Sequence, residues 1–517
     1  MVEDRRVPPE TAGPPVFGKE ASMFKKAGLL LAAVFCTLDL YALSFSVNGT
    51  GWSTKTDSEL SNLSYNLPRG DTSHAAVSLD ELFPAVYEAW RLDFQSARTE
   101  GLTRLSDPDL GNDLNRIYLI RDEDSWALLY KSRIFYSVER LNLECEPLEK
   151  DPLEIWINWE GIDLLRKEIE RWAVMHAVDV KVTEVPKPDS KLISISQAGG
   201  DVPDIIMVQS SHIDRLSNSG TIQNLDYMFP NGMAEQGRNA FSHDDKLWAV
   251  PFYSDAQMIF YNPMIIDTPD FNWSLADFEE LCLSAKNENI IPSAWNSYSA
   301  SFLIPFQMAF GKQNLVEPDG SIIINDEPTL AALEYVINLH NKGLMKPMER
   351  DAMTSLFVSG EAAMIISASY AIPHFLELGI PFKTAPLPIN PDTGLRVSPL
   401  LDFKAFAVTK RSHNTVGARR LIEYLCGMGV QQRFSAETAK LPALEAAWAA
   451  ADTDKPWYEA LNISSESGTV IPTEKAYSIY KNTMWKMLRF AISGKMPADQ
   501  VLKKTQDLVN KNIEDRE

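Results

Sequence analysis

The sequence predicts an α/β protein whose parallel sheet is covered by helices. From residue 153 the chain alternates between a strand (LEIWINW), an amphipathic helix (IDLLRKEIERWAVMH), a strand (VDVKVTEVP), a helix (KLISISQAGG) and a strand (PDIIMV). This order within about sixty residues predicts parallel strands joined by helical crossovers. The 517 residues are enough for two or three domains, and 45% hydrophobic with 23% charged residues is typical of a globular protein.

Later segments continue the alternation. The stretch KLWAVPFYSDAQMIFYN predicts two short strands around a polar middle, and WSLADFEELCLSAKN predicts a helix capped by Ser274. EAAMIISAS and FKTAPLPIN have the composition of strands, whereas GARRLIEYLCGMGVQQRFS and the last forty residues predict helices. The α/β prediction therefore extends to the end of the chain.

The first 44 residues have the organisation of an export signal. Two lysines precede an apolar run over 27–38, and Ala42 and Ser44 form a small-x-small cleavage pattern. We therefore expect a signal peptide over 23–44 and an exported protein. Cleavage would leave the protein in the periplasm or at the outer face of the cytoplasmic membrane.

Other interpretations of this leader stay open. Residues 1–22 are polar and rich in proline, so they are either a disordered extension or a mis-called start that precedes Met23. An uncleaved anchor helix is one alternative to cleavage, although Asp39 interrupts the apolar run. A lipoprotein attached through Cys36 is the other.

Residues 45–151 are expected to form a linker and a small helical N-terminal segment. The linker prediction rests on the abundance of Ser, Thr, Asn and Gly over 47–76. Apolar residues at helical spacing predict helices over 79–100 and 124–141, with a loop between them.

Composition and motifs exclude several classes of function. The net charge of −21, without a basic stripe, argues against nucleic-acid binding. The four cysteines lack CxxC spacing, so no metal site is predicted, although a single bridge among Cys145, Cys282 and Cys426 stays open. Because phosphate-loop, nucleotide-binding and nucleophile-elbow motifs are missing, we expect no cofactor and no enzyme. A glycosidase stays an alternative, since its paired carboxylates need no local motif.

The strand PDIIMV ends abruptly in polar residues. Gln209 and Ser210 follow its last apolar residue, and His212 lies just beyond them. Ligands of open α/β sheets are met at the carboxyl ends of strands, so these side chains are candidates for hydrogen bonds to a ligand. The alternative is that they only cap the helix that follows.

Six segments together resemble one family. LEIWINWEG, QAGGDVPDIIMVQSSHIDRLSNSGTIQNLD, KLWAVPFYSDAQMIFYNPMI, FNWSLADFEEL, LFVSGEAAMIISASYAIPHF and FAISGKMPADQVLKK occur in this order. They resemble the extracellular solute-binding proteins of ABC importers, in the sugar-binding, maltose-binding-protein-like group. The resemblance covers about 153–517. It departs at Tyr253 and Met258, where the family usually has small residues.

The resemblance implies a two-lobed periplasmic-binding-protein (Venus flytrap) fold with hinge crossings. Lobe one would comprise 152–254 and 404–445, and lobe two would comprise 258–403 and 470–517. The hinge strands would lie near 253–261 and 400–405, with a third crossing somewhere in 445–470. A ligand would be held between the lobes.

The resemblance and the strand ends together define the candidate site. Sugar recognition needs flat aromatic faces beside planar polar groups that fix the orientation of hydroxyls. For each aromatic the alternative is a core or surface position, and for each acid a solvated charge. The candidates are Trp159, Glu160, Gln209, Ser210, Asp255, Trp295, Tyr298, Tyr370 and Asp402.

The implied function is capture of a carbohydrate, an oligosaccharide in particular, and its delivery to permease subunits of an ABC importer. A monomer is expected, in contact with the membrane only through the permease or a possible anchor. The alternatives are a sensing role that feeds a receptor and a non-sugar ligand. The identity, length and linkage of the sugar stay open.

Overall fold

The computed structural model describes residues 42–514, apart from short gaps at 48–49, 70–71, 84–85, 99–101, 107–115, 123–124, 148–150, 229–231, 318, 450 and 474. The predicted disordered extension, the apolar run and Cys36 lie outside the described residues. The first strand, β1, begins at Ala42, so the predicted cut after Ser44 would remove half of it. Within the described part of the chain, no helix is long and apolar enough to span a bilayer.

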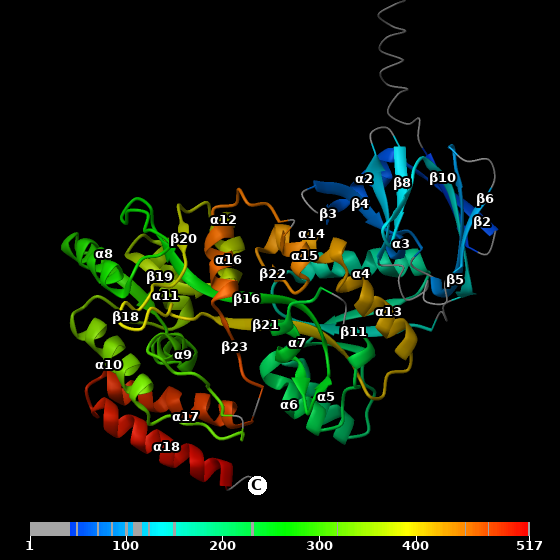
Figure 1. The fold of residues 1–517 in the computed structure, drawn as a ribbon. Coiled ribbons are helices and arrows are strands. Elements are labelled where there is room, and N and C mark those ends of the chain that lie inside the picture. Colours follow the sequence, from blue (N-terminus) through cyan, green and yellow to red (C-terminus); the bar gives the residue numbers. More distant parts are fainter. Residues whose placement is uncertain are drawn as a thin grey trace, which may run out of the picture.

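The N-terminal region, residues 42–147, is a β-domain and not the predicted linker and helices (Figure 1). Two five-stranded sheets, ordered β2-β1-β10-β5-β6 and β3-β4-β7-β8-β9, enclose an apolar core. The elements are β1 (Ala42–Val47), β2 (Thr50–Thr56), α2 (Asp57–Leu63), β3 (Tyr65–Arg69), β4 (Thr72–Ser78), α3 (Leu79–Leu82), β5 (Val86–Ser96), β6 (Leu102–Ser106), β7 (Ile117–Asp122), β8 (Ser125–Tyr130), β9 (Arg133–Phe135) and β10 (Val138–Pro147).

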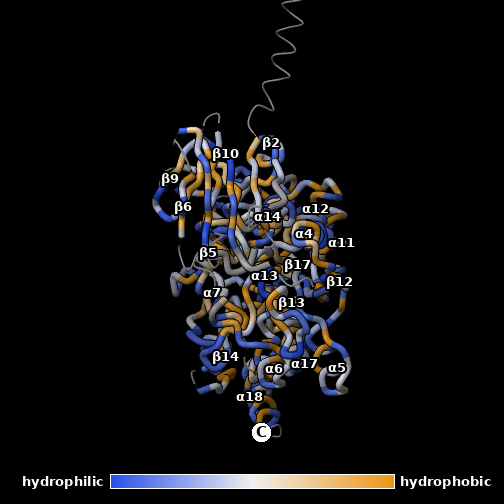
Figure 2. The backbone as a smooth tube through the Cα atoms, turned by 90° about the vertical axis from the view of Figure 1, so that its right-hand side faces the viewer, coloured by the Kyte–Doolittle hydropathy of each residue, from blue (hydrophilic) through white to orange (hydrophobic). Residues whose placement is uncertain are grey.

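The prediction of helices over 79–100 and 124–141 was wrong, because apolar residues spaced four apart also fit a strand. Residues four apart lie on the same face of a strand, where the side-chain period is two. Leu92 and Phe94 of β5 both lie in the core between the sheets. In β8 both faces are buried, with Leu128 in one apolar cluster and Leu129 in another, so no alternation is visible there. Along β10, apolar and polar residues do alternate (Figure 2).

Lobe one is an α/β unit. The expected strand-helix alternation is present, and β11, β12 and β13 are parallel neighbours. Its elements are β11 (Leu153–Ile157), α4 (Ile162–His176), β12 (Val180–Glu184), α5 (Pro188–Gln197), β13 (Ile205–Gln209), η3 (Ser210–His212), α6 (Ile213–Asn218), η4 (Asp226–Met228), α7 (Glu235–Ala240), β14 (Ser242–His243) and β15 (Lys246–Leu247), with α13 (Thr415–Leu425), α14 (Met428–Thr438), β22 (Leu441–Pro442) and α15 (Glu445–Ala449).

Lobe two repeats the α/β organisation. The predicted cap of α8 is present as a full capping box, in which Ser274 and Asp277 bond each other's backbone N–H groups. Its elements are α8 (Leu275–Asn287), β17 (Ile291–Trp295), α9 (Ala300–Ala309), α10 (Glu327–Asn341), β18 (Lys346–Pro347), α11 (Arg350–Val358), β19 (Ala362–Ala368), η5 (Ser369–Ala371), α12 (Ile372–Glu377), β20 (Lys383–Ala385), α16 (Tyr458–Glu466), β23 (Thr469–Val470), α17 (Lys475–Ile492) and α18 (Ala498–Glu514).

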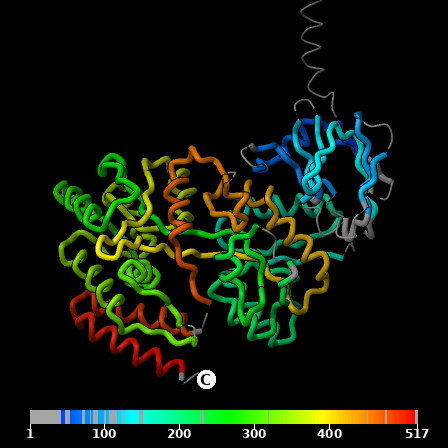
Figure 3. The backbone as a smooth tube through the Cα atoms, in the orientation of Figure 1, coloured from blue at the N-terminus to red at the C-terminus, as the bar shows by residue number. Residues whose placement is uncertain are grey.

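Two long strands cross between the lobes. β16 (Val250–Tyr261) and β21 (Leu400–Val408) are antiparallel neighbours in one sheet that runs through both lobes. Towards lobe one β21 pairs with β13, and towards lobe two β16 pairs with β19. β16 is one continuous strand of twelve residues, which corrects the prediction of two short strands there. All twelve residues are buried. Figure 3 follows these crossings in green and in yellow to orange between the two lobes.

The third connection runs from α15 to α16. α15 follows β22, which pairs with β16, and the backbone N–H of Glu445 donates to the carbonyl of Gly232 in lobe one. α16 packs on β16 and β20 on the lobe-two side. This crossing falls inside the predicted window of 445–470.

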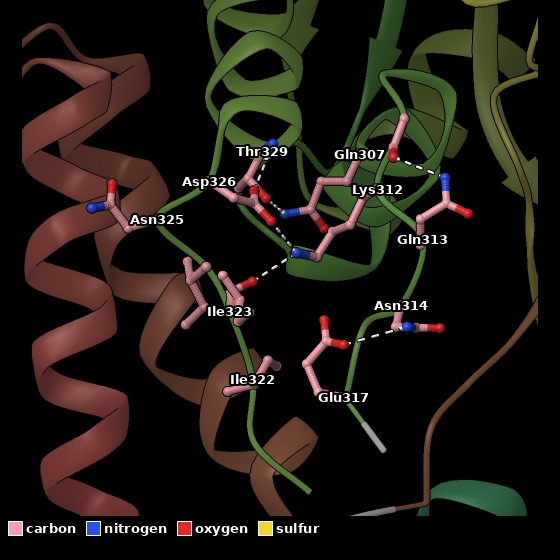
Figure 4. A network of polar contacts seen from close by, with 12 residues as sticks. Gln307, Lys312, Gln313, Asn314, Glu317, Ile322, Ile323, Asn325, Asp326 and Thr329 are labelled. Carbon is pink, nitrogen blue, oxygen red and sulfur yellow. Dashed lines mark hydrogen bonds and ion pairs between the residues drawn. The ribbon is translucent and has the colours of Figure 1, made fainter. Parts of the chain in front are cut away.

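A buried lysine inside lobe two has local hydrogen-bond partners. Lys312 donates from Nζ to Asp326 Oδ2 at 2.5 Å and to the carbonyl of Ile323 at 2.7 Å (Figure 4). Cys282 and Cys426 are both free and buried, so these two do not form the single bridge left open by the sequence.

Candidate ligand-binding site at the lobe crossing

Two aspartates face each other on the crossing strands. Asp255 of β16 and Asp402 of β21 are partners in the antiparallel register. Like charges placed directly opposite each other repel, so each carboxylate needs a balancing group. The Oδ1 of Asp255 accepts hydrogen bonds from Lys440 Nζ and from Ser369 Oγ, each at 2.7 Å. Because Ser369 belongs to lobe two and Lys440 follows α14 of lobe one, Asp255 contacts both lobes.

Lys440 is the central cation of this site. Its side chain is fully buried and forms ion pairs with Asp255 at 2.7 Å and Glu160 at 3.2 Å. The ammonium nitrogen lies 5.4 Å from the ring centroid of Tyr253 and 5.8 Å from that of Tyr370. Burial lowers the pKa of Lys440, but the two carboxylates outweigh burial and raise it above its ordinary value. The lysine is therefore charged at neutral pH.

Asp402 is held by a second lysine and by an amide. Gln209 Nε2 donates to both carboxylate oxygens of Asp402, at 2.8 and 3.0 Å, and Lys404 Nζ lies 2.8 Å away. The same ammonium lies 5.1 Å from the ring centroid of Trp159. The predicted strand-end residue Gln209 thus contacts the crossing strand, and Asp402 retains an exposed fraction of 31%. We call Glu160, Gln209, Asp255, Asp402, Lys404 and Lys440 the crossing cluster.

Two aromatic rings border the crossing cluster. Tyr370 lies in η5, directly after β19, and Trp159 lies in the loop between β11 and α4 with a positive φ of 72°. Both side chains are half-buried, so part of each ring stays accessible. Burial raises the pKa of Tyr370, so its phenol is neutral, and its Oη accepts from Ser367 Oγ at 3.3 Å. Flat aromatic faces therefore lie beside planar polar groups.

Three candidates lie elsewhere. Trp295 is fully buried and packs between Phe278 and Phe306 in the lobe-two core. Ser210, the first residue of η3, is also fully buried, and its hydroxyl has no hydrogen-bond partner among the described residues. Neither presents surface to a ligand in this arrangement. Tyr298 is half-buried and lies under the guanidinium of Arg489, 4.5 Å from its ring centroid.

Helix α17 supplies side chains that the sequence analysis missed. Tyr477, Lys481, Trp485 and Arg489 follow one another at intervals of four residues, which places them on one face of the helix. Burial raises the pKa of Tyr477 to about 12, and the nearby charge of Asp402 contributes to this rise. Burial lowers the pKa of His212 in lobe one, and Lys481 lowers it further. This face of α17 therefore extends from Tyr477, near Asp402, to Arg489, which contacts Tyr298 and Glu349 of lobe two.

The cationic partners were also missed, although one signal was available. Lys404 lies two residues after Asp402, so both point to the same face of β21. Lys440 is separated from Asp255 by 185 residues and follows a helix, and no local pattern connects the two. Among the described residues, no group of three or more His, Cys, Asp or Glu side chains is arranged to hold a metal ion.

Two α/β lobes that share long crossing strands, with polar groups at the crossing, define a two-lobed binding protein. Residues 170–460, more than half of the chain, match the family described as bacterial extracellular solute-binding protein. The chain belongs to this family, as the resemblance implied.

Similar proteins come from several bacteria. The chain is 20% identical to a maltodextrin-binding protein of Bacillus subtilis, over 69% of this chain and 88% of that protein. It is 24% identical to a galactooligosaccharide-binding protein of the same organism, over 57% of this chain and 73% of that protein. A maltose/maltodextrin-binding domain from Bdellovibrio bacteriovorus, solved with maltotriose, has a TM-score of 0.61 at 18% identity, over 70% of this chain and all of that domain. The two-lobed fold is thereby confirmed.

Proposed function

We propose that this solute-binding protein captures an oligosaccharide between its lobes and delivers it to the permease subunits of an ABC importer. The observation that carries the proposal is the pair of half-buried rings, Tyr370 and Trp159, beside the carboxylates of the crossing cluster. A sugar ring would stack on the aromatic faces, while its hydroxyls would donate to carboxylate oxygens.

The ion pairs of the crossing cluster prepare the carboxylates for this role. Asp402 forms an ion pair with Lys404 and keeps part of its surface exposed, so it can accept hydrogen bonds from two hydroxyls. Glu160 retains an exposed fraction of 43% while it pairs with Lys440. Charged acceptors that are already oriented need little reorganisation when a sugar arrives.

The length of the α17 face favours an oligosaccharide over a monosaccharide. The exposed part of this face, from Lys481 to Arg489, covers eight residue steps, about 12 Å at 1.5 Å per residue, which exceeds the length of one sugar ring. Trp485 is exposed along this face, and the Arg489 guanidinium lies 4.4 Å from its ring centroid. The names of the relatives, which refer to maltodextrin, maltotriose and galactooligosaccharide, support the same ligand class.

A thermal-shift screen over mono- and oligosaccharides tests the proposal. A ligand at 100 times its Kd stabilises the folded protein by about 2.7 kcal/mol, which is a measurable rise in Tm. Maltotriose, maltotetraose and a galactooligosaccharide are the first probes. Rises for amino acids, polyamines or ferric ion, without any for sugars, would favour the alternative of a non-sugar solute.

Sensing is the second candidate function, and the β-domain favours it. This domain docks on lobe one through α14, where Gln432 Nε2 donates to the carbonyl of Asn66 at 2.8 Å. It enlarges lobe one by a surface that a receptor could use. Sugar uptake by cells that lack this protein decides between the two roles: loss of uptake supports import, and unchanged uptake supports sensing.

Binding without hydrolysis is the expected chemistry. A glycosidase needs one carboxylic acid that stays protonated, and that group requires a raised pKa. Asp255 and Asp402 instead each form an ion pair with a lysine, at 2.7 and 2.8 Å. Oligosaccharide incubated with the protein should therefore be recovered intact by chromatography, and shortened products would support the glycosidase alternative.

A further inference from the structure

A cavity of about 520 Å³ lies where the β-domain meets the connection between the lobes. One wall comes from β3, a second from α14, and a third from lining residues at 447–448 and 451–458, in α15, at the start of α16 and between them. We infer that this junction cavity is a second carbohydrate-binding site and that its occupancy is coupled to the arrangement of the lobes. The site itself is independent of the proposed function, whereas the coupling rests on it.

The lining of the junction cavity combines aromatic rings with amides and charges. Tyr65, Trp448, Trp457 and Tyr458 contribute four aromatic side chains, and Asn66 and Gln432 contribute amides. Asp452 and Lys455, which are exposed and 3.4 Å apart, lie at the same cavity. Small-molecule sites typically measure 300–1,000 Å³ and combine apolar surface with a few polar groups. Aromatic faces with neutral amides match a ligand that has flat C–H faces and hydroxyls, which is a sugar ring.

Trp448 is held as a rigid platform in this cavity. Its indole Nε1 donates to Asn462 Oδ1 at 2.7 Å, and its ring stacks on Tyr458 with centroids 4.6 Å apart and planes at 18°. Its side chain is only half-buried. An aromatic ring that is already fixed loses little conformational entropy when a ligand stacks on it. Trp448 is therefore the residue on which we expect binding to depend most.

One side of the cavity belongs to lobe one and the β-domain. Arg433 of α14 forms ion pairs with Glu168 of α4 at 2.9 Å and with Glu81 of the β-domain at 3.3 Å. A Cβ on Gly429 would lie 2.3 Å from Glu81 Oε1, so the two parts approach as closely as a glycine allows. Tyr65 packs against Met428 and Ala447. The β-domain is thus fixed to lobe one at this wall.

The opposite side belongs to lobe two. Trp457 precedes α16, which packs on β16 and β20, and the Thr384 hydroxyl of β20 donates to the carbonyl of Pro456 at 3.3 Å. When the lobes move relative to each other, the walls of the cavity must also move. A ligand that prefers one arrangement of these walls shifts the equilibrium between lobe arrangements, and the effect on affinity is reciprocal between the two sites.

Titration calorimetry on the full chain tests this inference, with maltotriose as the first probe and maltotetraose as the second. Trp448→Ala removes the platform, and Ala436→Trp fills the cavity from an exposed position of α14 without removing any aromatic ring. Tyr370→Ala is the matched change at the crossing. We expect two binding events in the wild type. Trp448→Ala should weaken one event at least thirtyfold, as for an interface anchor, and Ala436→Trp should abolish the same event.

The outcomes separate the two sites. If one event depends on Trp448 and none on Tyr370, the junction site stands and the interlobe proposal fails. The inference is overturned if Trp448→Ala and Ala436→Trp titrate like the wild type while their unfolding midpoints are unchanged. It is also overturned if the wild type binds neither probe. The coupling is supported if Ala436→Trp changes the affinity of the remaining event severalfold.

Discussion

Lys440 balances two carboxylates at a place where its own side chain is fully buried. A charge in such a position is costly unless it is paired and hydrogen-bonded. The site therefore depends on a cation that the sequence pattern did not identify, beside acids that it did identify. Asp255, Asp402, Gln209 and Glu160 were all predicted from strand ends and the family resemblance, and all four belong to the crossing cluster.

Replacing Lys440 tests the cluster. We expect Lys440→Met to lower the free energy of unfolding by about 3–5 kcal/mol, because it leaves Asp255 buried without its cation. Urea denaturation measures this change, and calorimetry should show weaker sugar binding in the same variant. The control is Lys312→Met, which removes another buried lysine, paired with Asp326 inside lobe two (Figure 4). It should lose stability but keep its sugar affinity. Equal affinities in both variants would show that the cluster does not bind the ligand.

Tyr370 is expected to act as a stacking surface. Tyr370→Ala should raise the Kd for the cognate sugar at least thirtyfold, about 2 kcal/mol, because the flat apolar face is lost. Tyr370→Phe should change the Kd much less, since the ring stays and only the acceptor of the Ser367 hydrogen bond is removed. Calorimetry on both variants gives the answer. A Phe variant as weak as the Ala variant would assign the role to the hydroxyl, and wild-type binding by both would place Tyr370 outside the site.

At the scale of elements, prediction succeeded where one period dominated the pattern. The amphipathic stretch over 162–176 forms α4, and PDIIMV forms the buried part of β13. Prediction failed in the β-domain, because apolar residues four apart fit both a helix and a strand, and because β8 is buried on both faces. A capping box between Thr56 and Glu59 starts α2 inside a stretch whose composition resembles a linker.

The same limit explains the misplaced site residues. Trp295 ends β17, yet its side chain lies on the face that packs against α8 and α9, a choice decided by tertiary packing. Ser210 follows the last residue of β13, but it begins a 3₁₀ turn and is fully buried there. Strand-end position predicted the right edge of the sheet but could not predict the direction of each side chain.

His176, the last residue of α4, leads to a prediction of how the free energy of unfolding depends on pH. Burial lowers the pKa of His176 to about 3, while its ring stacks on Trp172. Its folded pKa is below the unfolded value of about 6.5. The contribution of His176 to the free energy of unfolding is therefore complete above pH 6.5, and it is lost as the pH falls towards 3. The expected slope is about 1.4 kcal/mol per pH unit in that window.

Denaturation at several pH values between 6.5 and 3 measures this slope. His176→Phe keeps a ring on Trp172 but removes the titrating group, so its stability should fall less steeply than that of the wild type. His374→Phe, at an exposed position of α12, is the control and should follow the wild type. If His176→Phe and the wild type lose stability with the same slope, His176 does not titrate as its burial requires.

At the scale of the whole molecule, β16 and β21 carry one sheet through both lobes in the described part of the chain, and the connection from α15 to α16 also joins the lobes. Such a connection permits rotation of one lobe against the other, and a ligand shifts the equilibrium by its differential affinity for the closed form. We expect the radius of gyration measured by small-angle scattering to decrease when the cognate sugar saturates the protein. An unchanged radius at verified saturation would contradict closure of the lobes on the ligand.

The central claim is that an oligosaccharide is held between the lobes at the crossing cluster. A crystal structure of the full chain with the sugar that gives the largest rise in Tm tests it most directly. The account predicts a sugar ring stacked on Tyr370 and hydroxyls within hydrogen-bond distance of the Asp402 carboxylate. Sugar bound only away from Tyr370 and Asp402, with the crossing cluster paired as it is here, would contradict the account.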